Sequence, residues 1–235
     1  MTTLAEPTEY GMKRARLIAL IRRHIEAELM LDSGVVSRRP AARNEKDERM
    51  KALLAGYANC RLCRLCEERK TIVSGSGSVA AKLMIVGEAP GADEDEQGLP
   101  FVGRSGQLLT KMLASIGMAR EDVYITNTVK CRPPANRNPE PDELSACQPF
   151  LRAQIEIIRP TLIVTLGGFA ARIILGLDEK TPISRVRGQV YLHDGIRCIP
   201  TFHPAYLLRN PSAKKEAWQD LKKIRVLLDE QGAKS

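Results

Sequence analysis

This 235-residue chain has no long apolar segment and few aromatic side chains, which make up 4% of its residues. Its longest apolar run is about six residues, whereas a membrane-spanning helix needs roughly 20. Residues 1–10 include two glutamates and lack the basic start and apolar centre of a secretory signal peptide. We therefore expect neither a membrane protein nor a secreted one, and we expect the chain to stay in the cytoplasm.

Cysteine and histidine are scarce, at six and three residues. In a cytoplasmic chain, cysteines are more often metal ligands or buried apolar residues than disulfide partners. Two overlapping C-x2-C pairs are followed by three separate cysteines: Cys60, Cys63 and Cys66, then Cys131, Cys147 and Cys198. Such a pair can supply two ligands of a four-thiolate site, but the count alone does not separate zinc from a [4Fe–4S] cluster. Buried thiols that bind no metal are the alternative, and we expect Cys198, inside an apolar strand, to be one.

Positive charge is in excess, with 36 Lys and Arg against 28 Asp and Glu. The net charge of +8 does not by itself identify a polyanionic partner. However, residues 180–226 hold ten of the basic residues and only three acidic ones. We therefore expect a phosphate-binding surface there, with salt-sensitive contacts.

Apolar runs and helical periodicity alternate from residue 60 onward. We expect strands at 82–87, 123–129, 161–166, 189–192 and 197–202, and helices at 105–116, 143–158, 168–175 and 214–228. This order predicts an α/β fold, a three-layer αβα sandwich with a mostly parallel central sheet of about four strands. Residues 10–31 predict an amphipathic helix, and the polar segment 37–49 a linker. We therefore divide the chain into an N-terminal helical extension and linker, 1–48, and a main domain, 49–235.

Three polar residues follow the expected strands at their carboxyl ends: Glu88, Asn127 and His203. Ligands of parallel sheets bind beyond those ends, so we expect the three side chains to meet in one crevice. A single loop glutamate is usually only solvated and a single asparagine often caps a turn. Three different polar groups at three strand exits favour a functional site.

The motifs around these residues resemble a known family. In order, they are Gly87–Gly91, Gly98–Gly103, Ile125–Asn127, Lys130–Pro134 and His203–Arg209. Together they resemble the type 4 (iron–sulfur) uracil-DNA glycosylases, over residues 60 to about 226 but not over 1–48. The resemblance implies an enzyme of base excision repair that flips uracil out of DNA and hydrolyses its N-glycosidic bond, leaving an abasic site. It also implies a bacterial or archaeal cytosol or nucleoid as the location.

The resemblance implies a role for each polar residue of the crevice. Glu88 would position or activate the water and stabilise positive charge on the sugar. His203, if neutral, would donate a hydrogen bond to uracil O2 as negative charge develops there. Asn127 would read the uracil edge, which cytosine reverses.

Further substrate-binding positions are implied at Ala89, Glu94 and Phe101. The ring of Phe101 would stack on uracil, which is worth roughly 1–3 kcal/mol, although a core phenylalanine is the alternative. Glu94 lies in an acidic run whose other members we expect to be solvated.

The segment after His203 would fill the gap that a flipped base leaves. Leu207 or Leu208 would be the apolar wedge, and Arg209 would bind phosphate. The sequence does not choose between the two leucines. Because prolines flank the segment, we expect it to be a loop.

The resemblance further implies a [4Fe–4S] cluster on Cys60, Cys63, Cys131 and Cys147, in a structural role. Spacing alone would fit Cys66 in place of Cys60 equally well. The partners expected are uracil-containing DNA and, through residues 1–48, a repair or replication protein, and we expect a monomer. A non-catalytic iron–sulfur or zinc protein that binds DNA on the same fold is the alternative function.

Overall fold

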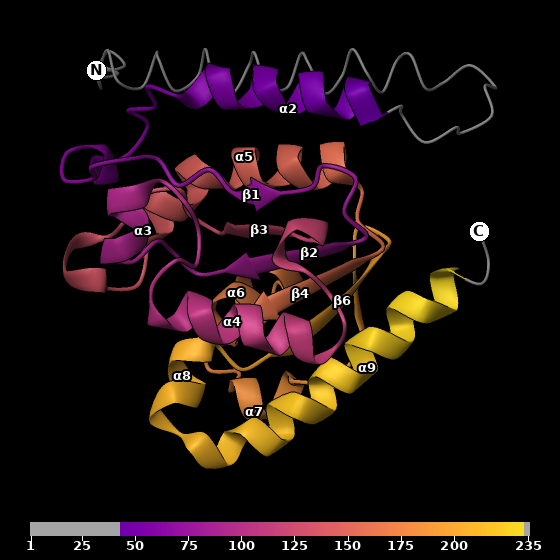
Figure 1. Cartoon of the computed structure of the whole chain (residues 1–235). Coiled ribbons are helices and arrows are strands. Elements are labelled where there is room, and N and C mark those ends of the chain that lie inside the picture. The colour runs from indigo at the N-terminus through magenta and orange to yellow at the C-terminus, as the bar shows by residue number, and fades with distance from the viewer. Residues whose placement is uncertain (1–42, 233–235) are drawn as a thin grey trace, which may run out of the picture.

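The computed structural model describes residues 43–232, which form a six-stranded mixed sheet with helices on both faces (Figure 1). The strands are β1 (Ser76–Gly77), β2 (Leu83–Gly87), β3 (Tyr124–Asn127), β4 (Leu162–Leu166), β5 (Tyr191–His193) and β6 (Ile196–Thr201). Their order across the sheet is β1-β3-β2-β4-β6-β5. The four central strands are parallel, and β1 and β5 pair antiparallel at the two edges. The predicted α/β class and parallel centre are confirmed, and the antiparallel edges bring the count above the four expected.

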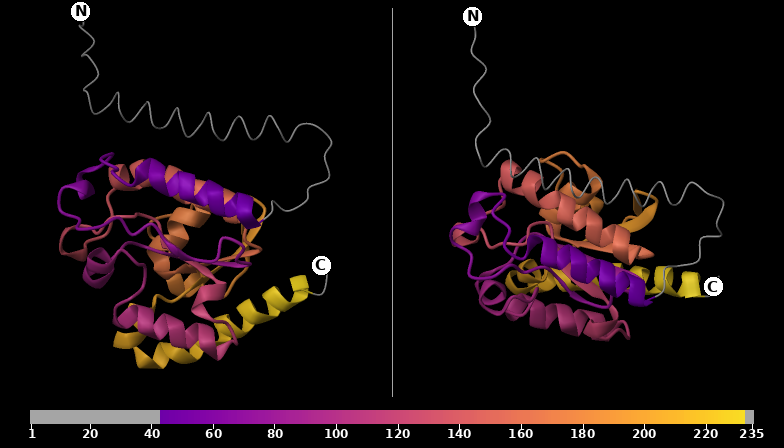
Figure 2. Two further views of the ribbon diagram at one scale, coloured as in Figure 1. Left: turned by 45° about the horizontal axis from the view of Figure 1, so that its top comes forward. Right: turned by 90° about the horizontal axis from the view of Figure 1, so that it is seen from above.

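Eight helices accompany the sheet within the described residues. They are α2 (Arg43–Tyr57), α3 (Ala92–Gln97), α4 (Arg104–Ser115), α5 (Pro141–Ile158), α6 (Gly167–Leu175), α7 (Ile183–Val186), α8 (Pro204–Arg209) and α9 (Lys214–Gly232). Figure 2 shows α2 and α5 side by side over one face of the sheet, with α4 and α9 on the other. The expected helix from 10 to 31 lies outside the described residues.

Alternating side chains of the buried strands supply the two halves of the core. Leu83 and Ile85 of β2 pack with α4 and α9, whereas Met84 and Val86 pack with α2, α5 and α6. Every residue of β2 and β4 is buried, as expected of strands covered on both faces. Cys198 is fully buried in the second cluster, as predicted.

Helix α2 corrects the expected linker. Residues 43–49 are helical, and α2 runs through the boundary that we set at residue 48. The Nζ atom of Lys46 donates to the carbonyl oxygen of Ile158, 2.7 Å away, where α5 ends. Met50 is buried against the sheet. This part of the N-terminal segment therefore belongs to the helical layer that covers one face.

No helix in the described part of the chain is both long and apolar enough to cross a membrane.

Candidate active site

A cleft opens beyond the carboxyl ends of β2, β3 and β6, with a volume of about 540 Å³. The structure brings seven of the predicted site residues to its lining: Glu88, Ala89, Glu94, Phe101, Asn127, His203 and Arg209. Leu207 and Leu208 do not line it. Arg104, Asn136 and Arg137 also line the cleft and were not singled out from the sequence. The strand-end rule thus located the crevice, but not the residues that other loops add to it.

Asn127 lines this cleft and carries a buried polar atom that has no partner within the described structure. It ends β3 beside Gly87, the last residue of β2, and only 1% of it is exposed. Its Oδ1 atom is buried and has no hydrogen-bond partner among the described residues. Buried polar atoms are nearly always paired, so an unpaired one in a cleft points to a ligand that supplies a donor.

Phe101 is a core residue that also lines the cleft, and its stacking on a base remains a prediction. It is buried in the hydrophobic core, and its ring also lines the cleft, 5.6 Å from the ring of His203 between centroids. Its backbone has a φ of 53°, a left-handed conformation that is strained for a bulky residue. Such strain often marks a side chain that the surrounding structure holds in a functional position.

The imidazole of His203 is neutral and its tautomer is fixed. Its Nδ1 atom accepts a hydrogen bond from the backbone N–H of Ala205, 3.1 Å away, and so caps α8. Burial and the nearby charge of Arg209 lower the pKa of His203 to about 4, against an opposing effect of Glu94. With Nδ1 as acceptor, the single proton resides on Nε2, which is free to donate.

The carboxyl group of Glu88 is partly buried at the exit of β2. Burial raises its pKa above the usual value, and the charge of Arg172 opposes this shift. The backbone of Glu88 is fixed, because its carbonyl oxygen accepts from Thr128 Oγ1 at 2.5 Å and from the N–H of Val129 at 3.3 Å. The side chain therefore extends from a rigid position.

Glu94 organises the loops of the cleft. Its carboxylate accepts backbone N–H groups from Gly91 at 3.1 Å, Val102 at 2.9 Å and Gly103 at 3.1 Å. Both oxygens are therefore engaged with the protein backbone. Contact with a substrate remains a prediction for Glu94, whereas its loop-tying role follows from these bonds.

Asp95 corrects the expectation that the rest of the acidic run is solvated. It is buried, and its carboxylate accepts from the backbone N–H groups of Lys70 and Thr71 at 3.0–3.3 Å. Helix α3 is thereby held against the segment that follows the first three cysteines.

Four cysteines line a second, apolar cavity. They are the four that the family resemblance implied, Cys60, Cys63, Cys131 and Cys147, whereas Cys66 is not in the lining. Burial raises the pKa of Cys63 to about 11 and that of Cys147 to about 12, so these thiols stay protonated at neutral pH unless a metal replaces the proton. Within residues 43–232, no three histidine, cysteine or carboxylate side chains are arranged to hold a single metal ion.

Comparison with known proteins places the chain in a family. The family model described as the Uracil DNA glycosylase superfamily matches residues 74–222. The type-4 uracil-DNA glycosylase of Archaeoglobus fulgidus is 50% identical over 175 residues, covering 72% of this chain and 88% of the relative. That of Thermotoga maritima is 44% identical over 190 residues, covering 80% and 98%. The chain belongs to the uracil-DNA glycosylase superfamily.

Within the superfamily, this glycosylase groups with type 4. A type-5 uracil-DNA glycosylase of Pyrobaculum aerophilum is 36% identical over 146 residues, covering 56% of the chain and 64% of the relative. The type-4 relatives match more of the chain at higher identity. The resemblance drawn from the sequence motifs is confirmed.

A buried carboxylate that the sequence analysis missed braces the glycosylase beside the cleft. Glu143 is fully buried and accepts from Arg137 at 2.6 and 2.9 Å, from Arg64 Nε at 3.1 Å and from the backbone N–H of Glu140 at 2.8 Å. Although burial acts in the opposite direction, these donors hold the pKa of Glu143 below its usual value. The brace joins the cysteine segment to the loop that carries Arg137 into the cleft. The sequence signal for this brace was the pair Glu140 and Glu143, which lie three residues apart at the start of α5.

The segment after His203 is a helix rather than the loop we expected. Pro204 occupies the first position of α8, where its missing N–H costs nothing, and His203 caps the helix. Leu207 points into the core and is 1% exposed, whereas Leu208 is 37% exposed.

Part of the positive charge of residues 180–226 is neutralised by ion pairs. Arg187 pairs with Asp220 at 2.5 Å, and Arg197 and Arg225 each pair with an acid of α9. Arg209, in contrast, lines the cleft. The phosphate-binding surface expected for this segment therefore depends on fewer charges than the composition suggested.

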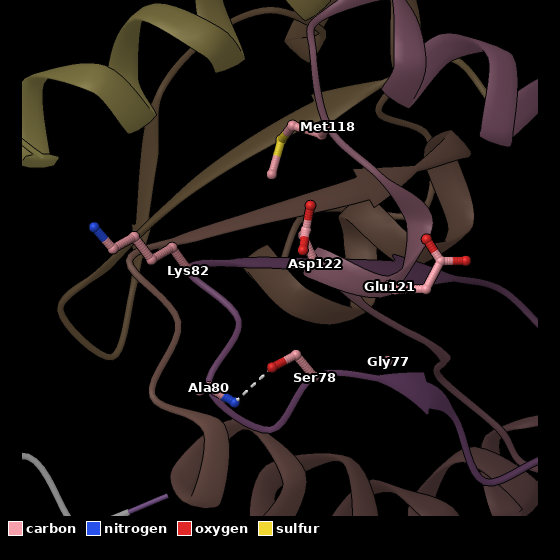
Figure 3. A pocket seen from close by; sticks show the side chains of 7 residues that line it. All are labelled: Gly77, Ser78, Ala80, Lys82, Met118, Glu121 and Asp122. Carbon is pink, nitrogen blue, oxygen red and sulfur yellow. Dashed lines mark hydrogen bonds between the residues drawn. The ribbon is translucent and has the colours of Figure 1, made fainter.

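A further pocket, of about 750 Å³, lies at the amino end of β2, away from the cleft (Figure 3). Its polar groups come from Ser78, Lys82, Glu121 and Asp122, and Ser78 Oγ accepts from the N–H of Ala80 at 3.2 Å. In the figure, the charged ends of Lys82 and Glu121 point away from each other. The glycosylase's catalytic candidates all lie at the other end of the sheet.

Proposed function

We propose that the cleft binds uracil flipped out of DNA and hydrolyses its N-glycosidic bond, releasing free uracil and leaving an abasic site. The observation that carries this proposal is that Asn127, a residue lining the cleft, has a buried Oδ1 atom with no hydrogen-bond partner within residues 43–232. The names of the type-4 relatives support it, since they are uracil-DNA glycosylases. The reaction belongs to the repair of DNA damage by base excision.

Asn127 would distinguish uracil from cytosine. Its Oδ1 atom accepts the N3–H of uracil, and its amide NH2 donates to O4. Cytosine presents an unprotonated N3 and an amino group at the same places, so both contacts become unfavourable. A buried site built for one hydrogen-bond pattern discriminates strongly against its reverse. Phe101, beside Asn127, offers the face on which the base stacks.

His203 stabilises the leaving group. When the bond between C1′ and N1 breaks, its electron pair stays on uracil, and negative charge spreads to O2. The Nε2–H of a neutral imidazole donates to that oxygen, as an oxyanion hole does. The pKa of about 4 keeps this group neutral under ordinary conditions.

Glu88 acts on the sugar side. Its carboxylate stabilises the positive charge on the sugar, orients the water that adds to C1′ and takes a proton from it. The raised pKa makes it a better base than an exposed carboxylate. The rigid backbone of Glu88 holds the group in place for this step.

Leu208 is the wedge that replaces the flipped base. Exposed apolar side chains insert between bases, whereas Leu207 is already used in the core. The next residue, Arg209, reaches the cleft and would bind a phosphate of the flipped nucleotide.

The donor set of the cysteine cavity supports the proposal of an iron–sulfur cluster. Four sulfurs from three chain segments line it, and two N–H donors point at them, from Arg69 to Cys131 Sγ and from the Lys130 backbone to Cys147 Sγ, both at 3.3 Å. A [4Fe–4S] cluster takes one thiolate on each iron and accepts such hydrogen bonds. Cys60, Cys63, Cys131 and Cys147 would hold it, and it would supply a structural cross-link rather than a step of the hydrolysis.

The partner proposals are DNA that contains uracil and, through residues 1–48, a repair or replication protein. We also propose that the enzyme acts as a monomer in the cytosol or nucleoid. Residues 1–42 lie outside the described structure, so comparing full-length protein with a chain lacking 1–42 in pull-downs is the test of the second partner.

A strand with a single uracil tests the function. The enzyme should release uracil, and alkali should then cut the strand at the abasic site, whereas a matched strand with cytosine stays intact. Intact uracil strands at stoichiometric enzyme, with DNA still bound, would instead support the alternative of a non-catalytic iron–sulfur or zinc protein. Metal analysis and absorbance near 400 nm separate iron from zinc.

A further inference from the structure

Lys130 is a buried residue that lines the cysteine cavity, and its ammonium group contacts the backbone of Asn127, which lines the cleft. Only 1% of the residue is exposed. Its Nζ atom donates to the Oγ1 atom of Thr126 at 2.6 Å and to the backbone carbonyl oxygen of Asn127 at 2.7 Å. Lys130 therefore holds the backbone of Asn127, whose side chain belongs to the cleft.

Lys130 also contacts the cysteines. The residue lines their cavity, its backbone N–H donates to Cys147 Sγ at 3.3 Å, and Cys131 follows it in the chain. Within residues 43–232, the acceptors of its ammonium group are the Thr126 hydroxyl and the Asn127 carbonyl oxygen, and neither is a carboxylate. A buried charge without a counter-charge costs several kcal/mol, so an anion is expected nearby. The cavity thiols would become that anion when a metal replaces their protons.

The turn that Lys130 stabilises also contacts the backbone of Glu88, the other residue of the proposed catalytic site at this edge. The N–H of Thr128 donates to the carbonyl oxygen of Gly87 at 2.9 Å, and its Oγ1 donates to that of Glu88. Residues 127–130 are thus joined to the exit of β2. A shift of this turn would move both the uracil-reading amide and the backbone of Glu88.

We propose that Lys130 is a positioning residue that serves as the counter-ion of a thiolate-bound centre and couples that centre to Asn127. The expected effect of Lys130 on kcat rests on the proposed function. Its expected effect on the thiolate-bound centre rests on the four cysteines that line the cavity. A thiolate-bound cluster carries net negative charge, which the ammonium offsets. A centre bound in the cavity would then hold the ammonium group of Lys130 in place. That group would in turn hold Asn127, and with it the side-chain amide, in position.

The test replaces Lys130 with methionine, which keeps the side-chain volume but removes the charge and the donor. Lys111→Met, on the exposed side of α4, is the matched control. We expect Lys130→Met to lose iron faster in air, to shift the reduction potential of the centre to more negative values, and to lower kcat on uracil DNA at least tenfold with KM little changed. The control should match the parent protein in all three.

Wild-type iron retention, reduction potential and kcat in Lys130→Met would overturn the inference. If that variant does not fold, Thr126→Val decides, because it removes one acceptor of the ammonium and keeps the charge. Lowered kcat with full iron content then supports the coupling, and wild-type kcat contradicts it. A parent protein that is inactive on uracil DNA would instead defeat the proposed function, while the iron and potential readouts still test the counter-ion.

Discussion

Gly87 and Asn127 face each other at the ends of β2 and β3, and the amide of Asn127 occupies the space that a Cβ atom on Gly87 would need. That Cβ atom would overlap Oδ1 of Asn127 and lie 2.6 Å from Cζ of Phe101. The glycine is thus required by the position of two cleft side chains rather than by its own backbone conformation.

We expect Gly87→Ala to lower kcat/KM on uracil DNA at least 100-fold, because a displacement of about 1 Å in a binding group can cost that much. The control is Gly56→Ala in α2, where a Cβ meets nothing within 4 Å. It should keep full activity and gain up to about 1 kcal/mol in the free energy of unfolding, because alanine favours helix. Full activity in Gly87→Ala would show that the amide does not read the base.

His203→Asn should separate catalysis from helix capping. Asparagine can still cap α8, but it lacks the Nε2–H donor, so we expect the single-turnover excision rate to fall about 10²- to 10³-fold with DNA affinity nearly unchanged. Folding lowers the pKa of His203 from 6.5 to about 4. The unfolded chain therefore binds the proton first, and the parent protein loses stability as the pH falls from about 6.5 to about 4. The variant should lose less over that range. Weakened DNA binding with an unchanged rate would make His203 a docking residue.

Glu88 should set the acidic limit of activity. Its pKa lies above the ordinary value of 4.5, whereas His203 stays neutral down to about 4, so the rate should fall with the protonation of Glu88 as the pH drops. Glu88→Gln should have a low rate that no longer falls as the pH drops. Because folding raises this pKa, ionised Glu88 lowers stability above pH 4.5, and Glu88→Gln should unfold at a higher temperature at neutral pH. An unchanged acidic limb in the variant would assign it to another group.

The two adjacent leucines of α8 should give opposite results. Leu207→Ala should lower the free energy of unfolding by about 2–5 kcal/mol, because it leaves a cavity in the core. Leu208→Ala should change it by no more than about 0.5 kcal/mol. On duplex DNA, however, Leu208→Ala should excise uracil at least tenfold more slowly, with little change on single strands, where no gap needs filling. Chemical denaturation and excision assays on both substrates measure these effects. Equal loss on both substrates would argue against a wedge.

The cysteines of the overlapping pairs should differ in iron binding. Cys66→Ser should keep the full iron content and absorbance near 400 nm, because Cys66 does not line the cavity. Cys60→Ser should lose both, along with thermal stability. Iron analysis of the purified variants checks this, and loss of iron in Cys66→Ser alone would move the ligand set to the other pair.

The parallel centre of the sheet could be predicted because its strands are apolar on both faces, as in β2 and β4. The cleft followed from the same prediction, since parallel strands expose their carboxyl ends together. The features that could not be predicted depend on contacts between segments that are far apart in the sequence. The burial of Asp95 requires the backbone of Lys70 and Thr71, and no local pattern shows that pairing.

Two of the expectations overlook signals that the local sequence contains. The prolines around α8 predict a loop, although proline favours the first helical position and His203 can cap the helix. Residues 43–49 lack apolar side chains and so predict a linker, although Glu, Lys and Arg favour helix and α5 supplies a surface to pack on. Only tertiary packing shows which of two adjacent leucines turns inward, so the choice between Leu207 and Leu208 required the structure.

The origin of the four cavity cysteines in three separate chain segments sets an order for biosynthesis. Cys60 and Cys63 leave the ribosome well before Cys147, which lies on α5. At about 5–20 residues per second, that delay is on the order of ten seconds. The first two thiols are thus synthesised before the other two cavity cysteines exist. Iron insertion would then be a late step of maturation, and a chain that stops short of α5 would never acquire it.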